Sequence, residues 1–117
     1  MKLRNAAAAA VAAFALTLSL SGSALAATGD FSYKYVDGLG HEQKIVLHDP
    51  HSGKCVNLYA VGSDEVQPGY GPHNQTDAAV IVYKGANCTG PEYRLRANGN
   101  PARDDLEVRS VTFDAAV

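Results

Sequence analysis

The sequence predicts a small all-β protein, a sandwich of about six to eight short strands held by one disulfide. Three observations lead to this fold class. Short segments alternate apolar and polar residues, glycine and proline cluster between these segments, and no window places apolar residues at helical spacing. In addition, the two cysteines, Cys55 and Cys88, are an even number in a short chain.

The first two strands are expected at residues 31–36 and 43–48. In 31–36 (FSYKYV) three aromatic residues alternate with polar ones, which is typical of a strand with one buried face. The Asp37-Gly38 pair that follows is a strong turn signal. The apolar 43–48 (QKIVLH) then ends at the turn-forming sequence DPHSG.

The middle of the chain is expected to contain two strands and a long loop. Residues 54–60 (KCVNLYA) alternate, and residues 78–84 (AAVIVYK) form the most apolar segment, which we expect to be the most buried strand. Between them, residues 61–76 contain two prolines and three glycines and are expected to form a loop. Two further strands, 92–97 and 106–113, complete the sandwich on either side of the turn sequence NGNPARDD.

The N-terminal segment has the features of a secretory signal peptide. Lys2 and Arg4 precede an apolar run from Ala6 to Leu20, and Ala24-Leu25-Ala26 fits the small-x-small pattern of a cleavage site. We therefore expect residues 1–26 to be a signal peptide and residues 27–117 to be a single secreted domain; the alternative is a retained membrane anchor.

The charge of the expected mature chain argues against nucleic acid as a partner. Two of the 10 basic residues lie in the leader and none of the 12 acidic residues does, so the mature chain has four more acidic than basic residues. An acidic chain with dispersed basic residues repels a phosphate backbone. No membrane contact is expected after cleavage, and a monomer is expected.

In an exported chain the two cysteines are expected to form a disulfide. On the chain-entropy model, closing this loop contributes roughly 3–4 kcal/mol. Free thiols and a metal site are the alternatives.

The chain also contains a weak internal repeat. A shift of 50 residues places Tyr33-Lys34 on Tyr83-Lys84, Gly40 on Gly90 and Glu42 on Glu92. The repeat predicts two similar four-stranded units packed face to face.

The second half of the chain resembles the Greek-key motif of the βγ-crystallin family. Tyr83 and Gly90 match its aromatic-x6-Gly signature, and Ser110 follows in VRSVTF. The resemblance implies that Tyr83 packs over a hairpin corner, that Gly90 has positive φ and that the Ser110 hydroxyl holds the hairpin. The first half matches only at Tyr33 and Gly40, with Ala60 at the place of the serine. The whole chain also resembles small two-cysteine proteins exported by actinobacteria, a class that implies no function.

The resemblance makes calcium a candidate ligand, because microbial members of the family often bind it. Asp105 matches the first acidic position, but Leu106 fails the second and Arg109 stands where a hydroxyl is needed. Asp104 and Asp105 remain as a weak calcium site, or as a solvated acidic turn.

Other chemistries have less support. His41, His48, His51 and Cys55 have spacings that zinc ligands adopt, but a disulfide removes Cys55 from such a site. The serines lie in no nucleophile elbow. No catalytic residue, metal or cofactor is therefore expected, and the protein is expected not to be an enzyme.

The remaining candidate is the 61–76 loop. Tyr70 lies between glycines there, with Pro68, Pro72 and His73 beside it, as in a rigid binding loop. The alternative is that Tyr70 packs back onto the sheet. The leading hypothesis is a non-enzymatic binding domain for an extracellular protein or glycan. The alternatives are an inhibitor of an extracellular hydrolase, presenting the 61–76 loop, and a calcium-stabilised structural domain.

Overall fold

Eight strands and a one-turn 3-10 helix make up the fold. The computed structural model describes residues 26–114 of the chain, so most of the expected signal peptide lies outside the described residues. The elements are β1 (Gly29–Val36), β2 (Glu42–His48), β3 (Cys55–Asn57), β4 (Gly69–Thr76), β5 (Val80–Tyr83), η1 (Ala86–Cys88), β6 (Glu92–Leu95), β7 (Glu107–Val108) and β8 (Ser110–Phe113). No helix among the described residues is long and apolar enough to cross a membrane.

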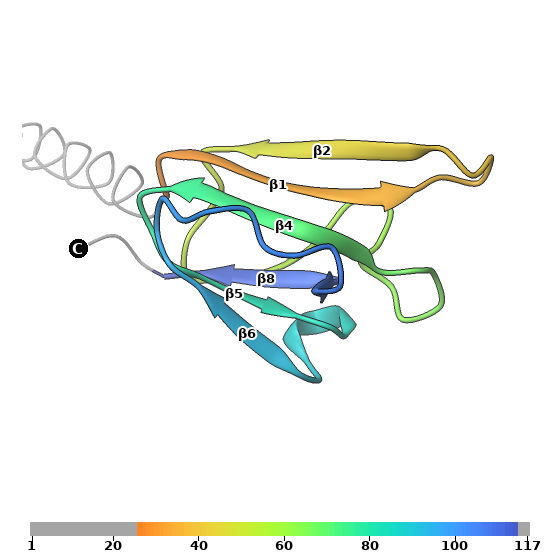
Figure 1. The fold of residues 1–117 in the computed structure, drawn as a ribbon. Coiled ribbons are helices and arrows are strands. Elements are labelled where there is room, and N and C mark those ends of the chain that lie inside the picture. Colours follow the sequence, from red (N-terminus) through yellow and green to blue (C-terminus); the bar gives the residue numbers. More distant parts are fainter. Residues whose placement is uncertain (1–25, 115–117) are drawn as a thin grey trace, which may run out of the picture.

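The strands form two antiparallel four-stranded sheets that pack as a sandwich (Figure 1). The first sheet has the order β2-β1-β4-β7 and the second has the order β3-β8-β5-β6. The predicted all-β sandwich is therefore confirmed. Each half of the chain gives its third strand to the sheet of the other half, since β3 lies in the second sheet and β7 in the first.

The 50-residue repeat falls on equivalent positions of the two halves. Gly40 and Gly90 both have positive φ, +84° and +80°, in the turn after the first strand of their half. Glu42 and Glu92 both begin the second strand. The expected pair of four-stranded units packed face to face is present, but each sheet takes three strands from one half of the chain and one from the other, because β3 and β7 are exchanged.

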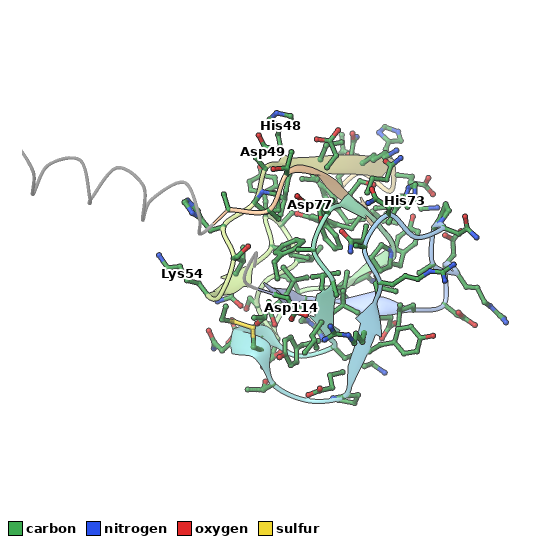
Figure 2. All side chains as sticks on the ribbon, turned by 90° about the vertical axis from the view of Figure 1, so that its left-hand side faces the viewer. His48, Asp49, Lys54, His73, Asp77 and Asp114 are labelled. Atoms are coloured by element: carbon green, nitrogen blue, oxygen red, sulfur yellow. A yellow bond between two sulfur atoms is a disulfide. The ribbon has the colours of Figure 1, made fainter. Side chains whose placement is uncertain are left out.

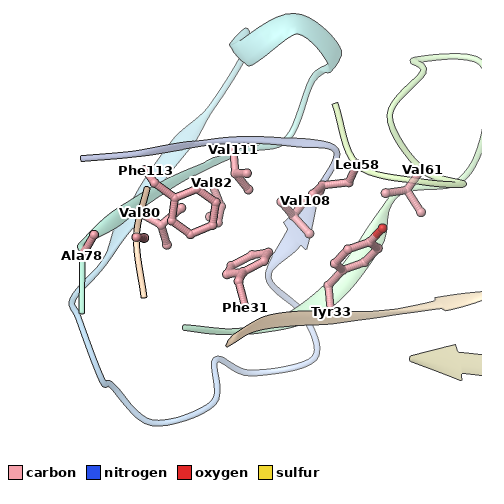
Figure 3. Packing of buried hydrophobic residues seen from close by; sticks show 11 residues of the cluster. Phe31, Tyr33, Leu58, Val61, Ala78, Val80, Val82, Val108, Val111 and Phe113 are labelled. Carbon is pink, nitrogen blue, oxygen red and sulfur yellow. The ribbon is translucent and has the colours of Figure 1, made fainter. Parts of the chain in front are cut away.

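The core lies between the two sheets and is formed by one face of each central strand (Figure 3). Phe31 and Tyr33 project from β1 toward the second sheet, as expected for alternate residues of a strand. The ring of Phe31 meets that of Phe113 edge to face at 5.4 Å between centroids. Val80 and Val82 of β5 fill the space beside them, which confirms that this apolar segment is buried. Burying each of these large side chains stabilises the fold by about 1.5–3 kcal/mol.

Strand β4 corrects the expected loop at 61–76. Residues 69–76 are a strand, and only residues 58–68 connect β3 to β4. The pairing with β1 shifts between Ser32, opposite His73, and Lys34, opposite Tyr70, so that Gly71 and Pro72 form a bulge. A bulge accepts the positive φ of Gly71 (+58°) and the missing N–H of Pro72. The glycines and prolines therefore mark an irregular strand and not a loop.

The expected strand at 106–113 is two strands that lie in different sheets. β7 pairs with β4 in the first sheet, and β8 pairs with β3 and β5 in the second. The chain crosses between the sheets at Arg109, whose N–H donates to the carbonyl of Tyr83 (2.8 Å). An alternating apolar pattern does not reveal such a crossing, because both strands face the same core.

The predicted disulfide between Cys55 and Cys88 is present and joins β3 to η1. It connects the two halves of the chain, which the exchanged strands also connect. The first described residues are part of the fold: Ala26 bridges to His51, and the buried Ala27 donates its N–H to the carbonyl of Pro50 (2.9 Å).

Candidate functional site

A chain of polar contacts crosses the outer surface of the first sheet at Tyr70. Tyr70 lies on β4, and its hydroxyl donates to Glu42 Oε1 on β2 (2.8 Å). Lys34 on β1 lies between them, with Nζ 5.5 Å from the centre of the Tyr70 ring, and donates to Asp104 Oδ1 (2.7 Å). The hydrogen bond to Glu42 raises the pKa of Tyr70, and the bond to Asp104 raises the pKa of Lys34. The expectation that Tyr70 is presented by a loop is therefore wrong, since its ring lies on the sheet.

These contacts border an open hollow of about 410 Å³ at the end of the sandwich where β4 begins. Pro68 and Tyr70, expected as a binding loop, and Asp104, expected as a calcium ligand, lie together in it. The full lining is Val36, Gln67, Pro68, Gly69, Tyr70, Asp104 and Glu107. We call this surface the Tyr70 hollow.

The other two residues of the expected binding loop lie outside the Tyr70 hollow. Pro72 is buried in the β4 bulge, and His73 Nε2 lies 3.1 Å from the carbonyl oxygen of Gly99. Neither side chain is presented by an exposed loop tip, because both belong to strand β4.

The two aspartates expected as a weak calcium site each pair with a cationic side chain. Asp104 accepts from Lys34, and Asp105 Oδ2 accepts from Arg103 at 3.1 Å. Within residues 26–114 no group of three or more histidine, cysteine or carboxylate side chains is placed to hold a metal ion.

Arg109, which stands where the calcium motif needs a hydroxyl, is itself surrounded by oxygen atoms. Its guanidinium donates to the carbonyls of Ser63 (3.0 Å), Lys84 (2.9 Å) and Val66 (2.7 Å). Asp64 Oδ1 lies 4.0 Å away and accepts from a backbone N–H of η1. The guanidinium thus joins the 58–68 loop to the turn after β5, a role that no spacing in the sequence indicates.

The histidines are not assembled into a zinc site with Cys55, because Cys55 is half of the disulfide. His48 contacts two carboxylates instead, with Nδ1 at 2.8 Å from Asp30 Oδ1 and Nε2 at 3.4 Å from Asp49 Oδ2 (Figure 2). The hydrogen bond to Asp30 raises the pKa of His48.

Ser110 fixes the corner after β5. Its hydroxyl donates to the carbonyl of Gly85 (2.6 Å) and accepts from the N–H of Cys88 (2.8 Å). Gly90 has φ +80° in the same turn, a conformation that favours glycine. Tyr83, on the strand that leads into this corner, is half-buried.

Two surfaces were missed by the sequence patterns. One is the β1–β2 turn, where the side chain of Leu39 is 82% exposed. The other is an open groove of about 720 Å³ between β6 and the segment that leads to β7. A leucine between two glycines in the turn was a signal for the first, whereas the groove depends on how the 97–106 segment folds back.

No protein-family model, curated protein or solved structure matches this chain. What the protein does is therefore inferred from its own residues.

Proposed function

We propose that this protein is a secreted, non-enzymatic binding domain that contacts an extracellular protein through the Tyr70 hollow. The single observation that carries this proposal is that Pro68 and Tyr70, at the start of β4, share one surface with Asp104, from the segment before β7. The expected signal peptide and the disulfide, which persists in oxidising compartments, support secretion.

The chemistry of the hollow suits recognition. Tyrosine offers a large, rigid contact area with a polar end, and such residues dominate the energetics of protein interfaces. The bond to Glu42 and the ammonium of Lys34 hold the Tyr70 ring in place, which lowers the entropy lost on binding. The two carboxylates of the lining, Asp104 and Glu107, each pair with a lysine, Lys34 and Lys84, so recognition is expected to depend on the Tyr70 ring more than on net charge.

The binding test compares Tyr70→Ala with the wild type as immobilised bait for proteins secreted by the producing organism. We expect the variant to lose the partner that the wild type captures. Tyr59→Ala is the matched control, because Tyr59 is a tyrosine with 69% exposure that does not line the hollow. Equal capture by Tyr70→Ala and wild type would overturn the proposal, provided that both melt at similar temperatures.

The same test separates the other candidate functions. Loss of hydrolase activity in the captured fraction identifies an inhibitor, with residues 58–68 and Tyr70 as the contact. Capture that is abolished by glycosidase treatment of the secreted material identifies a glycan. Calcium has less support, since Asp104 and Asp105 already pair with Lys34 and Arg103.

We also infer a βγ-crystallin-like Greek-key arrangement for this domain. In each half the fourth strand lies beside the first, with the second strand on the other side of the first, and the third strand lies in the opposite sheet. A Greek key likewise returns its fourth strand beside the first. The corner contacts of Ser110 and the positive φ of Gly90 support this inference.

A further inference from the structure

The β1–β2 turn exposes one large apolar side chain, that of Leu39. Leu39 is 82% exposed and lies between Gly38 and Gly40, which carry no side chains. In Figure 1 this turn extends to the right beyond the rest of the described chain. A single projecting leucine with nothing bulky beside it has the shape to enter a concave surface.

Asp37 makes the turn rigid. Its Oδ1 accepts from the N–H groups of Leu39 and His41, both at 2.9 Å, and its Oδ2 accepts from Gln43 Nε2 at 3.0 Å. These bonds lower the pKa of Asp37, the bond from the His41 N–H first among them. Leu39 is therefore held exposed by three hydrogen bonds to a single carboxylate, so little conformational freedom is lost when it is buried by a partner.

The groove of about 720 Å³ lies along the far edge of the molecule from this turn. The groove runs beside β6 and lies near β7, which is one edge strand of the first sheet. The turn leads into β2, which is the opposite edge strand of that sheet. The largest apolar residues of the groove are Tyr93, which is 57% exposed, Leu95 and Leu106. The inner face of β6 is not fully covered there, since Tyr93 lies opposite the buried Val82 and yet remains exposed.

The two surfaces carry opposite charge. Residues 37–42 of the turn include Asp37 and Glu42 and no lysine or arginine. The groove is lined by three arginines, Arg94, Arg96 and Arg103, against one carboxylate, Asp105.

The arginines keep charge available for a partner. Arg94 pairs with Asp114 and Arg103 with Asp105 on exposed side chains, which solvent screens. Arg96 takes part in no ion pair within residues 26–114.

We propose that the Leu39 turn of one molecule docks into the groove of a second copy of this chain. Leu39 of one molecule enters between Tyr93, Leu95 and Leu106 of the other. The acidic residues of its turn then face the arginines that line the groove. Both halves of the contact lie on one chain and carry opposite charge, which favours a second copy over an unrelated partner. None of the residues proposed for this contact lines the Tyr70 hollow, although Glu42 also accepts the hydrogen bond from Tyr70.

The positions of the two surfaces decide the form of the assembly. Turn and groove are different patches at opposite sheet edges, so the contact is heterologous. A dimer joined by one such contact retains one free turn and one free groove, so further copies add to it until a ring closes or an open filament grows. This association differs from the monomer expected from the sequence.

The experiment uses two variants of the full chain that each remove one half of the contact. Leu39→Asp removes the apolar side chain of the turn. Arg96→Glu combined with Arg103→Glu reverses the charge of the groove. Val46→Asp is the matched control, because Val46 is an apolar residue of β2 with 52% exposure outside both surfaces. All of these positions are exposed, and unchanged melting temperatures will confirm that the variants fold.

Analytical ultracentrifugation over a wide concentration range gives the outcome. We expect wild type and Val46→Asp to associate beyond a dimer, and each contact variant to weaken association by about 10- to 100-fold. An equimolar mixture of the two contact variants should form a 1:1 dimer and nothing larger, because only one working turn meets one working groove. A monomeric wild type, a Leu39→Asp variant that associates normally, or a mixture that stays monomeric would overturn the proposal.

Discussion

At the scale of single residues, Arg109 is notable because one guanidinium donates to three backbone carbonyls. Its side chain is only 16% exposed, and its three carbonyl acceptors come from two separate segments, the 58–68 loop and Lys84. A planar guanidinium with several fixed donors suits this arrangement, whereas an ammonium group does not. The residue also lies where the chain passes from one sheet to the other, so its contacts position both β7 and β8.

Replacing Arg109 should therefore destabilise the protein strongly. We expect Arg109→Ala to lower the free energy of unfolding by about 2–3 kcal/mol, because three carbonyls lose a charged donor. Arg109→Lys should recover less than half of this loss. Urea denaturation measures both. Arg103→Ala is the control, with an expected change of about 0.5 kcal/mol or less for a side chain that is 87% exposed; equal effects at the two positions would contradict the role of Arg109.

His48 should make stability depend on pH near neutrality. Its contacts with Asp30 and Asp49 raise its pKa in the folded protein above the ordinary value near 6.5. The stabilisation is therefore complete below about pH 6.5 and is lost as the pH rises through the folded pKa.

An NMR titration of the imidazole C–H signals measures this pKa directly. We also expect the melting temperature of the wild type to fall more than that of His48→Gln between about pH 6 and pH 8. A midpoint at or below the ordinary value would show that the two carboxylates do not hold the proton.

At the scale of elements, the disulfide and the η1 corner form one unit. Cys88 donates its N–H to Ser110 Oγ, and its sulfur bonds to Cys55 on β3, the neighbour of β8. Short elements such as the three-residue β3 form few ladder hydrogen bonds of their own. The disulfide therefore stabilises β3, an edge strand whose own pairing with β8 is short.

Removing the disulfide should cost roughly 3–4 kcal/mol of stability, because it closes a loop with a sequence separation of 33 residues. Urea denaturation of the Cys55→Ala, Cys88→Ala double variant measures this loss. For the wild type, alkylation of the native protein should add no mass. Two added alkyl groups, or an unchanged denaturation midpoint in the variant, would contradict this account.

The elements that the sequence predicts well are those whose pattern is local. Residues 31–36 and 78–84 alternate or are continuously apolar, and they form β1 and β5. β4 was missed because Gly71 and Pro72 are accommodated by a partner strand from more than 30 residues away, which no local pattern records. The split of 106–113 was missed for a related reason, since the partner sheet of each strand is a tertiary property.

The candidate site was predicted only in its components. Tyr70 was expected from the glycines and prolines beside it, and Asp104 from the calcium motif that the resemblance implies. Their common surface depends on Lys34, which contacts both and which the sequence marks only as part of the internal repeat. The placement of Leu39 between two glycines is only a weak signal, because the sequence does not show whether a leucine in a turn folds back or projects. Only its 82% exposure in a turn fixed by Asp37 makes it informative.

At the scale of the whole molecule, the exchange of β3 and β7 makes the two halves interdependent. Val108 of β7 is fully buried, although its sheet neighbours belong to the first half. Phe31 of the first half likewise packs against Phe113 of the second. Neither half can therefore bury its apolar residues alone.

We therefore expect neither half of the chain to fold by itself. A fragment of residues 27–77 keeps β1 to β4 but loses β7 and the core residues of β5 and β8, and a fragment of residues 78–117 loses β3. Both are also near the size below which a single core is insufficient, roughly 40 residues. Each should give poorly dispersed amide signals in an NMR spectrum. Mixing them under oxidising conditions should restore the native spectrum, because both exchanged strands and the disulfide can then form. Cooperative unfolding by either fragment alone would mean that the halves are independent units and that strand exchange is not required for stability.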